Sequence, residues 1–358
     1  MAMSLQNVFL LSGSLFCLLA SVVLFAFLNR GKLRFLKPAA IISLLVFASC
    51  AAYGFSALSP ADFITPTSFG KFILPAASAI ILAILISFNL PTILKKLIAI
   101  ILPCGVCFII CGPTEIYPAA ISALLWILIY LALPVSNYFA GVSSSQTVCF
   151  GCGILILGFI GAVPSAIGFY GICLAAAAAG FLLFNWPPSP LNLSNSDAEV
   201  LGFLIGGIAA YASIEGSTAS ALIFVLFPLC EAGFALLQKI TFIQRFSDLT
   251  ANTAAGKAVA SGLDPITLIQ HILRINIMML LFGCMQAYAP DQHSLPLVCA
   301  AIIIWQMYRL IHWNSLSSGI SETNKNIISE FKKNFAEIKT NVKKASSANT
   351  SQKTDHKN

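Results

Sequence analysis

Long apolar stretches, separated by short polar segments, make up most of the chain. They lie at 7–28, 38–58, 72–92, 97–111, 117–134, 148–163, 166–185, 199–214, 217–237, 272–289 and 294–313. A helix of about 20 apolar residues crosses the hydrocarbon core of a bilayer. In lipid the backbone must satisfy its own hydrogen bonds, which favours helices. The pattern therefore predicts an all-α polytopic membrane bundle of about eleven transmembrane helices.

The composition supports a membrane protein. Hydrophobic residues make up 58% of the chain and charged residues only 9%, whereas soluble domains carry about a quarter charged residues. The first stretch is long for a signal peptide and is followed by basic residues rather than by a small-residue cleavage site, so we expect it to stay in the protein. The basic residues form no motif that indicates nucleic-acid binding.

The distribution of charge between the stretches predicts their orientation. Basic residues follow the first, third, ninth and eleventh stretches: Arg30, Lys32, Arg34, Lys37, Lys95, Lys96, Lys239, Arg245, Lys257 and Arg309. The alternate connections carry Asp62, Glu115, Glu215 and Asp291, with Lys71 as their only base. Because basic loops stay in the cytoplasm, we expect the N-terminus outside and the C-terminus inside.

Three longer polar segments, 135–147, 186–198 and 238–271, fall on the cytoplasmic face in this topology. Loops gathered on one face of a scaffold often carry function, so we expect the working surface there. Two domains follow: a membrane domain at 1–313 and a basic cytoplasmic tail at 314–358.

The tail carries apolar residues at helical spacing with lysines between them: Ile328, Phe331, Phe335, Ile338 and Val342. This spacing predicts an amphipathic helix at about 321–345. Such a helix either lies on an anionic leaflet or pairs with a partner helix. The sequence does not distinguish these partners, and it does not indicate an oligomeric state.

Ionisable and metal-binding residues are scarce. Only nine acids precede the tail, and no two of them form an Asp-Asp or Asp-x-x-Asp pair. Glu231 is either a functional buried acid or an interior hydrogen-bonding group. His271 and Arg274 share a helical face, where they either bind a phosphate or anchor the helix at the interface. The cysteine pairs 104/107 and 149/152 have the spacing of redox or zinc sites, but their apolar surroundings favour ordinary helix positions.

Residues 184–207 (Phe-Asn-Trp-Pro-Pro-Ser-Pro-Leu-Asn-Leu-Ser-Asn-Ser-Asp-Ala-Glu-Val-Leu-Gly-Phe-Leu-Ile-Gly-Gly) carry a more specific motif. The segment resembles a signature of the polyprenyl-phosphate N-acetylhexosamine-1-phosphate transferases (glycosyltransferase family 4). The shared frame comprises Asn185, Pro187, Pro188, Leu193, Ser196, Leu201, Gly202 and Phe203. Two shorter segments resemble that family more weakly: 136–143 is similar to its Asn-Leu-x-Asp-Gly-Leu-Asp loop, and 268–271 to its His-x-His-His motif.

The resemblance implies a function in the bacterial plasma membrane. Members of the family move a sugar-1-phosphate from a UDP-sugar to polyprenyl phosphate, with Mg²⁺, in cell-envelope glycan synthesis. By position it implies that Asp197 and His271 are catalytic. It also implies a set of substrate-binding residues, which are Asn137, Asn185, Asn195, Gln270 and Arg274.

The chain differs from the family at the positions of the family's catalytic aspartates. Asn195, Ala140, Ser143, Leu90 and Pro91 occupy positions at which the family has aspartates. Those carboxylates hold the metal and offset the diphosphate charge, and neutral side chains do neither. Three hypotheses therefore stay open: a diverged transferase, an inactive binding or regulatory partner in envelope glycan assembly, and, if the motif is fortuitous, a small-solute transporter.

Overall fold

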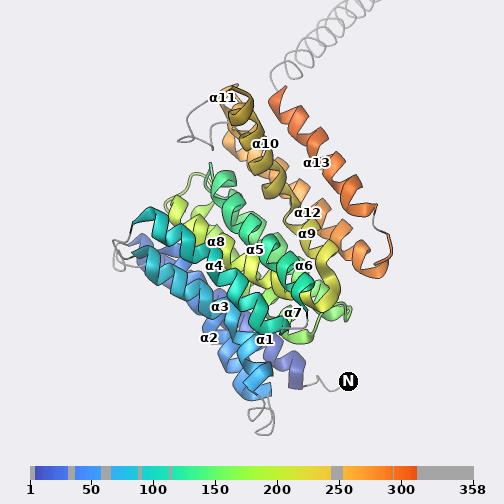
Figure 1. The fold of residues 1–358 in the computed structure, drawn as a ribbon. Helices are drawn as coiled ribbons and strands as arrows, with labels where there is room; N and C mark the ends of the chain where they lie inside the picture. Colours follow the sequence, from blue (N-terminus) through green and yellow to red (C-terminus); the bar gives the residue numbers. More distant parts are fainter. Residues whose placement is uncertain are drawn as a thin grey trace, which may run out of the picture. The chain divides into compact units, whose positions relative to one another are not determined.

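The computed structural model describes residues 5–30, 37–57, 66–87, 91–112, 115–242, 253–292 and 294–312. Every regular element in these ranges is a helix (Figure 1). The predicted tail helix at about 321–345 lies outside the described residues and stays a prediction. Asp62 and Leu90 lie outside them as well.

The described helices mostly follow the predicted apolar stretches. In chain order they are α1 (Leu5–Asn29), α2 (Pro38–Ala57), α3 (Pro66–Ser87), α4 (Thr92–Cys111), α5 (Ile116–Ser136), α6 (Val142–Phe159), α7 (Ser165–Asn185), α8 (Asn195–Ala212), the π-helical turn η1 (Ser213–Ser217), α9 (Thr218–Phe224), α10 (Leu226–Phe242), α11 (Ala254–Ala260), α12 (Pro265–Tyr288) and α13 (Leu295–Ile311). The ninth stretch, 217–237, is divided into α9 and α10 at Val225, and α11 lies in a segment predicted to be a loop. Seven helices of the described part are long and apolar enough to cross a membrane. Shorter apolar helices cover Pro38–Ala52, Ile73–Ile86, Leu226–Gln238 and Leu295–Ile311. The protein is a helical membrane protein.

Small residues allow the central helices to approach closely. α6 packs along α7, and α5 along α8. At the first contact, Gly151 faces Gly171 so closely that an added Cβ would lie 2.6 Å from the Gly171 carbonyl oxygen. At the second, the ring of Trp126 lies 5.0 Å from that of Phe203, and an added Cβ at Gly206 would meet the Trp126 ring. Close approach of this kind stabilises helix pairs in lipid, where the hydrophobic effect does not hold helices together.

The outer helices expose large apolar side chains instead of polar ones. Leu15 and Phe16 on α1, Ile93 and Ile101 on α4, and Trp305 on α13 are each more than half exposed. Exposed apolar surface on this scale is unusual in soluble monomers. It is the surface that contact with lipid tails requires.

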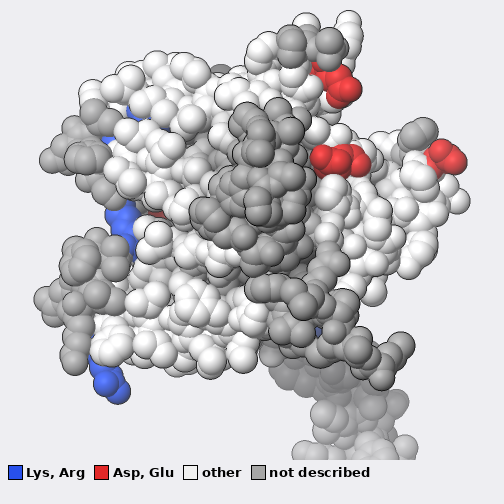
Figure 2. Space-filling model, turned by 90° about the horizontal axis from the view of Figure 1, so that it is seen from below, with Lys and Arg blue, Asp and Glu red and all other residues white. Residues whose placement is uncertain are grey.

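Most exposed acids lie apart from the exposed Lys and Arg side chains, with Asp264, exposed at the start of α12, as an exception. On the face shown in Figure 2, acidic side chains lie at one end and Lys and Arg side chains at the other. Exposed acids of the described part include Glu115, which precedes α5, Glu215 in η1, and Asp291 between α12 and α13. At the start of α8, Lys95 and Lys96 act electrostatically on Glu199.

The connection predicted at 135–147 is shorter than expected. α6 begins at Val142, so the loop between α5 and α6 contains only residues 137–141. The serines and the threonine that suggested a loop are buried in the first turns of α6. Two of their hydroxyls donate to backbone carbonyls of the helix, Ser145 to Val142 (2.8 Å) and Thr147 to Ser143 (2.6 Å), and the other two donate to asparagine side chains. Internal hydrogen bonding thus lets a polar sequence form a buried helix.

The other two polar segments are also partly helical. α8 begins at Asn195, within the expected loop 186–198. In the segment 238–271, α10 continues to Phe242, α11 covers Ala254–Ala260 and α12 begins at Pro265. His271 therefore lies inside α12 rather than before it. Capping side chains account for two of these starts: Ser194 accepts from the Asp197 amide (3.2 Å), and Asp264 accepts from the amides of α12.

We expect Gly151→Ala to destabilise the bundle, because its Cβ would overlap Gly171 backbone atoms and force α6 and α7 apart. The cost should be about 1–3 kcal/mol. The matched control is Gly105→Ala in α4, where no atom lies within 4 Å of the added Cβ. Thermal unfolding in detergent measures both variants. Equal melting temperatures for the two variants would contradict the packing described.

Candidate functional site

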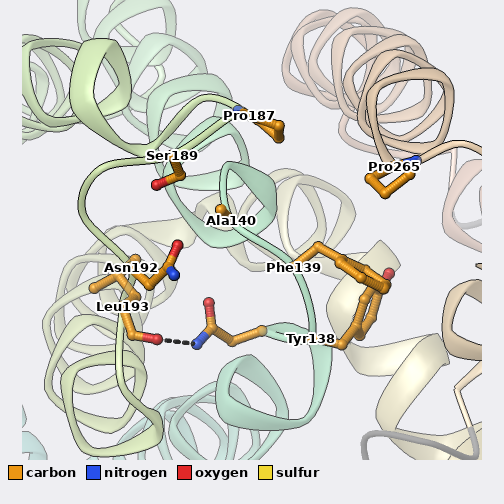
Figure 3. A pocket seen from close by; sticks show the side chains of 9 residues that line it. Tyr138, Phe139, Ala140, Pro187, Ser189, Asn192, Leu193 and Pro265 are labelled. Carbon is orange, nitrogen blue, oxygen red and sulfur yellow. Dashed lines mark hydrogen bonds between the residues drawn. The ribbon is translucent and has the colours of Figure 1, made fainter.

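A cavity of about 400 Å³ opens where the two motif-bearing loops meet (Figure 3). Its described lining comprises Asn137, Tyr138, Phe139, Ala140, Pro187, Ser189, Asn192, Leu193 and Pro265. The first four belong to the α5–α6 loop, the next four to the α7–α8 loop, and Pro265 begins α12. The segments at 136–143 and 184–207, which carry the family resemblance separately in sequence, thus form one site. We call it the loop cavity.

Gly141 gives the α5–α6 loop its tight geometry. Its φ of 89° is left-handed, a conformation that glycine adopts without the steric cost that a side chain brings. An added Cβ would also lie 3.3 Å from Ile269 Cδ1 and 3.4 Å from the Asn185 carbonyl oxygen. The glycine therefore allows this loop to lie directly against the α7–α8 loop and α12.

Asn185 joins the two loops. Its side-chain Oδ1 accepts hydrogen bonds from the Gly141 amide (2.7 Å) and from Ser144 Oγ (2.8 Å). Its Nδ2 donates to the Leu191 carbonyl (2.7 Å) within its own loop. The residue is only 1% exposed. The sequence predicted a substrate-binding role for Asn185, but its side chain is engaged by the protein and does not line the cavity.

Asn137 ties the loops together and also lines the cavity. Its Nδ2 donates to the Leu193 carbonyl (3.1 Å), and its Oδ1 accepts from Ser143 Oγ (2.9 Å). Asn192, which is exposed, projects into the same space (Figure 3). Asn192 is not among the residues predicted from the sequence, because the residues shared with the family lie on either side of it.

A buried carboxylate lies behind the cavity wall. Glu231 on α10 is 0% exposed, and its Oε1 accepts from the Ala255 amide in the first turn of α11 (3.2 Å). The side chain of Tyr138 is close enough to Glu231 to interact with it electrostatically. The ring of Tyr138 packs edge-on against that of Phe139, with 5.5 Å between the ring centroids. Neither Tyr138 Oη nor Glu231 Oε2 makes a well-aligned hydrogen bond within the described part. Burial, with the negative charge of Glu231, raises the pKa of Tyr138 well above its usual range, so its hydroxyl keeps its proton.

Asp197, the predicted catalytic acid, closes a capping box at the start of α8. Its Oδ2 accepts from the Ser194 amide (3.2 Å) and from Ser194 Oγ (2.5 Å). Its Oδ1 accepts from the Ala39 amide at the start of α2 (3.4 Å). The side chain is 3% exposed. Its carboxylate therefore stabilises helix ends, and it does not line the cavity.

The remaining predicted residues lie outside the cavity lining. Asn195 is exposed at the first position of α8. On α12, Gln270 and Arg274 are exposed and His271 is partly buried, whereas only Pro265 from that helix reaches the cavity. Arg274 brings a positive charge to the helical face that it shares with His271, and both Arg274 and Arg309 act electrostatically on His271. Whether these side chains bind substrate stays a prediction.

The loop cavity does not fit a magnesium ion. Magnesium is held in proteins by carboxylates together with phosphate oxygens. None of the nine described lining residues is acidic. Across the part of the chain that the structure describes, no group of three or more His, Cys, Asp or Glu side chains is placed to hold a metal. The cavity offers neutral amide and hydroxyl groups instead.

No protein-family model matches the chain, and no curated protein matches it. The transferase resemblance stays a prediction from the residues of 136–143, 184–207 and 268–271.

We expect Asn185→Ala to lower the free energy of unfolding by about 2–4 kcal/mol. It removes three hydrogen bonds and leaves the buried Gly141 amide without its partner. Asn195→Ala changes the same residue type at an exposed position and should cost less than about 0.5 kcal/mol. Thermal or denaturant unfolding in detergent would compare them. Equal losses of stability would show that Asn185 does not hold the loops together.

Glu231 gives a second test. Glu231→Ala should destabilise by about 2–4 kcal/mol, because it leaves a cavity and an unpaired Ala255 amide. Glu231→Gln keeps an oxygen for that amide and adds a donor, so it should unfold near the wild-type temperature. Destabilisation by Gln as large as that by Ala would show that the negative charge itself is required.

Proposed function

We propose that this chain is a diverged member of the polyprenyl-phosphate N-acetylhexosamine-1-phosphate transferase family that binds a UDP-sugar without transferring it. It would act as a binding or regulatory partner in envelope glycan assembly in the bacterial plasma membrane. The observation that carries this proposal is the loop cavity. The two loops that resemble the family form it together, yet its lining is neutral.

The chemistry of the lining supports binding of an uncharged polar group. Asn137, Ser189 and Asn192 supply amides and a hydroxyl, and Tyr138 and Phe139 supply aromatic surface. Amides pair with the donor and acceptor edge of a base or with sugar hydroxyls, and aromatic rings stack on flat or apolar faces. A uridine or an N-acetylhexosamine presents both kinds of group.

The positions of the nearby acids argue against the ordinary transfer reaction. That reaction brings a lipid phosphate against a diphosphate and requires positive charge, or a metal held by carboxylates, to offset repulsion. The carboxylate of Asp197 is occupied at the ends of α8 and α2, and that of Glu231 lies behind the cavity wall. We therefore infer that no magnesium-dependent step takes place in this cavity.

The proposal places the loop cavity on the cytoplasmic side. It assumes about eleven spans, with the N-terminus outside and the C-terminus inside. On the face shown in Figure 2, most exposed acids lie apart from Lys and Arg, which supports that orientation. UDP-sugars are cytoplasmic, and polyprenyl phosphate would approach the same side from the inner leaflet. In this topology the tail at 314–358 meets either anionic lipid or a partner helix.

Two measurements on the purified protein test the proposal. With undecaprenyl phosphate, magnesium and UDP-N-acetylglucosamine, we expect no UMP above a no-protein control. In equilibrium dialysis, UDP-N-acetylglucosamine should bind saturably. Asn192→Ala should weaken that binding about tenfold, because it removes an amide from the cavity. Asn29→Ala should leave binding unchanged, because that exposed side chain at the end of α1 lies outside the described lining.

Two outcomes would overturn this proposal. UMP release that is lost in Asp197→Ala and His271→Ala would establish an active transferase with a rebuilt site. The absence of saturable binding by several UDP-sugars would remove the nucleotide-sugar function altogether. Uptake of a solute by reconstituted vesicles would then favour a transporter.

A further inference from the structure

A second cavity, of about 260 Å³, lies where α8 gives way to α9. It is lined by Ala162, Glu215, Gly216, Ser217, Ala219, Ser220, Gln286, Ala287 and Pro290. These residues come from η1 and α9, from the α6–α7 connection and from the end of α12. We call it the turn cavity. It shares no described lining residue with the loop cavity.

A break in the helix creates the recess. Gly216 has a φ of 92° inside η1, where the chain leaves helical geometry. No atom lies within 4 Å of a Cβ added there, so the glycine borders open space. Ser217 fixes the turn by donating its hydroxyl to the Ala162 carbonyl (2.8 Å). α9 then packs against α12, which brings Gln286 to the recess.

Gln286 contributes an acceptor without a partner. Its Nε2 donates to the Ala289 carbonyl (3.2 Å) and to the Pro290 carbonyl (3.3 Å). Because carbonyl oxygens only accept, these contacts fix which end of the amide is nitrogen. The remaining Oε1 is buried and has no hydrogen-bond partner within the described part, although the residue is only 2% exposed. A buried oxygen in this state calls for a donor.

The other polar groups of the cavity also present acceptors. Glu215 is exposed, and its ionised carboxylate has hydrogen-bond acceptors but no donor. Ser217 has committed its hydroxyl proton to Ala162, so toward the cavity it offers lone pairs. No lysine, arginine or histidine is among the described lining residues. These three groups together present a carboxylate, an amide oxygen and a hydroxyl oxygen to the cavity, and the fourth polar side chain of the lining, Ser220, carries a hydroxyl that can donate or accept.

We propose that the turn cavity binds a primary ammonium group. An ammonium carries one positive charge and three donors and no acceptor, which complements a carboxylate, an amide oxygen and a hydroxyl oxygen. Calcium needs six to eight oxygen ligands, more than this set provides. The ammonium belongs either to a free small amine or to an aminophospholipid headgroup. Both sources present the same chemistry at the end of the bundle where most of the exposed acids lie.

The test uses the full chain purified in detergent, with ethanolamine as the probe and uncharged N-acetylethanolamine as its matched analogue. Saturation-transfer NMR or calorimetry should detect saturable binding of ethanolamine alone. Glu215→Gln should weaken it about tenfold. Glu115→Gln should have no effect, because Glu115 is exposed and makes no capping bond, and it does not line the turn cavity. In a second arm, nanodiscs compare phosphatidylethanolamine with phosphatidylcholine.

Each outcome bears on the proposal. Binding of ethanolamine that depends on Glu215 supports a free amine, and a Glu215-dependent preference for phosphatidylethanolamine nanodiscs supports the lipid headgroup. Equal binding of N-acetylethanolamine would overturn the ammonium assignment. So would equal affinities in Glu215→Gln and Glu115→Gln, or the absence of saturable binding in both arms. Glu215 is exposed, so its replacement by glutamine keeps the fold in which these comparisons are made.

Discussion

The side-chain amide of Asn185 is the interaction on which the candidate site depends. Inside an apolar bundle, an irregular loop must find partners for its backbone without water. Asn185 provides them for both loops at once, through Gly141 and Ser144 on one side and Leu191 on the other. Because the amide holds the two loops edge to edge, a cavity forms between them. The same bonds remove Asn185 from the set of groups that a ligand could contact.

The buried acids of the membrane domain are likewise engaged by hydrogen bonds from the protein itself. Buried carboxylates are costly unless hydrogen bonds compensate them. Asp197 meets this requirement at the start of α8, and Glu231 meets part of it at the start of α11. Each stabilises the N-terminal end of a helix, where negative charge is favourable. The loop cavity is thereby left with amides, hydroxyls and rings, a lining suited to recognition rather than to metal-dependent chemistry.

The two cavities differ in chemistry because they lie at different helix connections. The loop cavity carries donors as well as acceptors, from Asn137 and Asn192. At the turn cavity, Gln286 and Ser217 have used their donors on neighbouring carbonyls, and Glu215 adds negative charge. One site is therefore suited to an uncharged polar group and the other to a cation.

The sequence alone determined the helical membrane class, since apolar stretches of bilayer length have few other solutions. It also located the two loops of the candidate site through the residues at 136–143 and 184–207. The sequence pattern placed the start of α6 too late. A run of serine and threonine residues predicts a loop, but here these side chains are buried and hydrogen-bonded in the first turns of the helix. Only the tertiary structure decided which side chains face a cavity. Asn185 and Asp197 carry suitable chemistry, but partners distant in sequence, Gly141 and Ala39, engage them, and composition does not record such contacts.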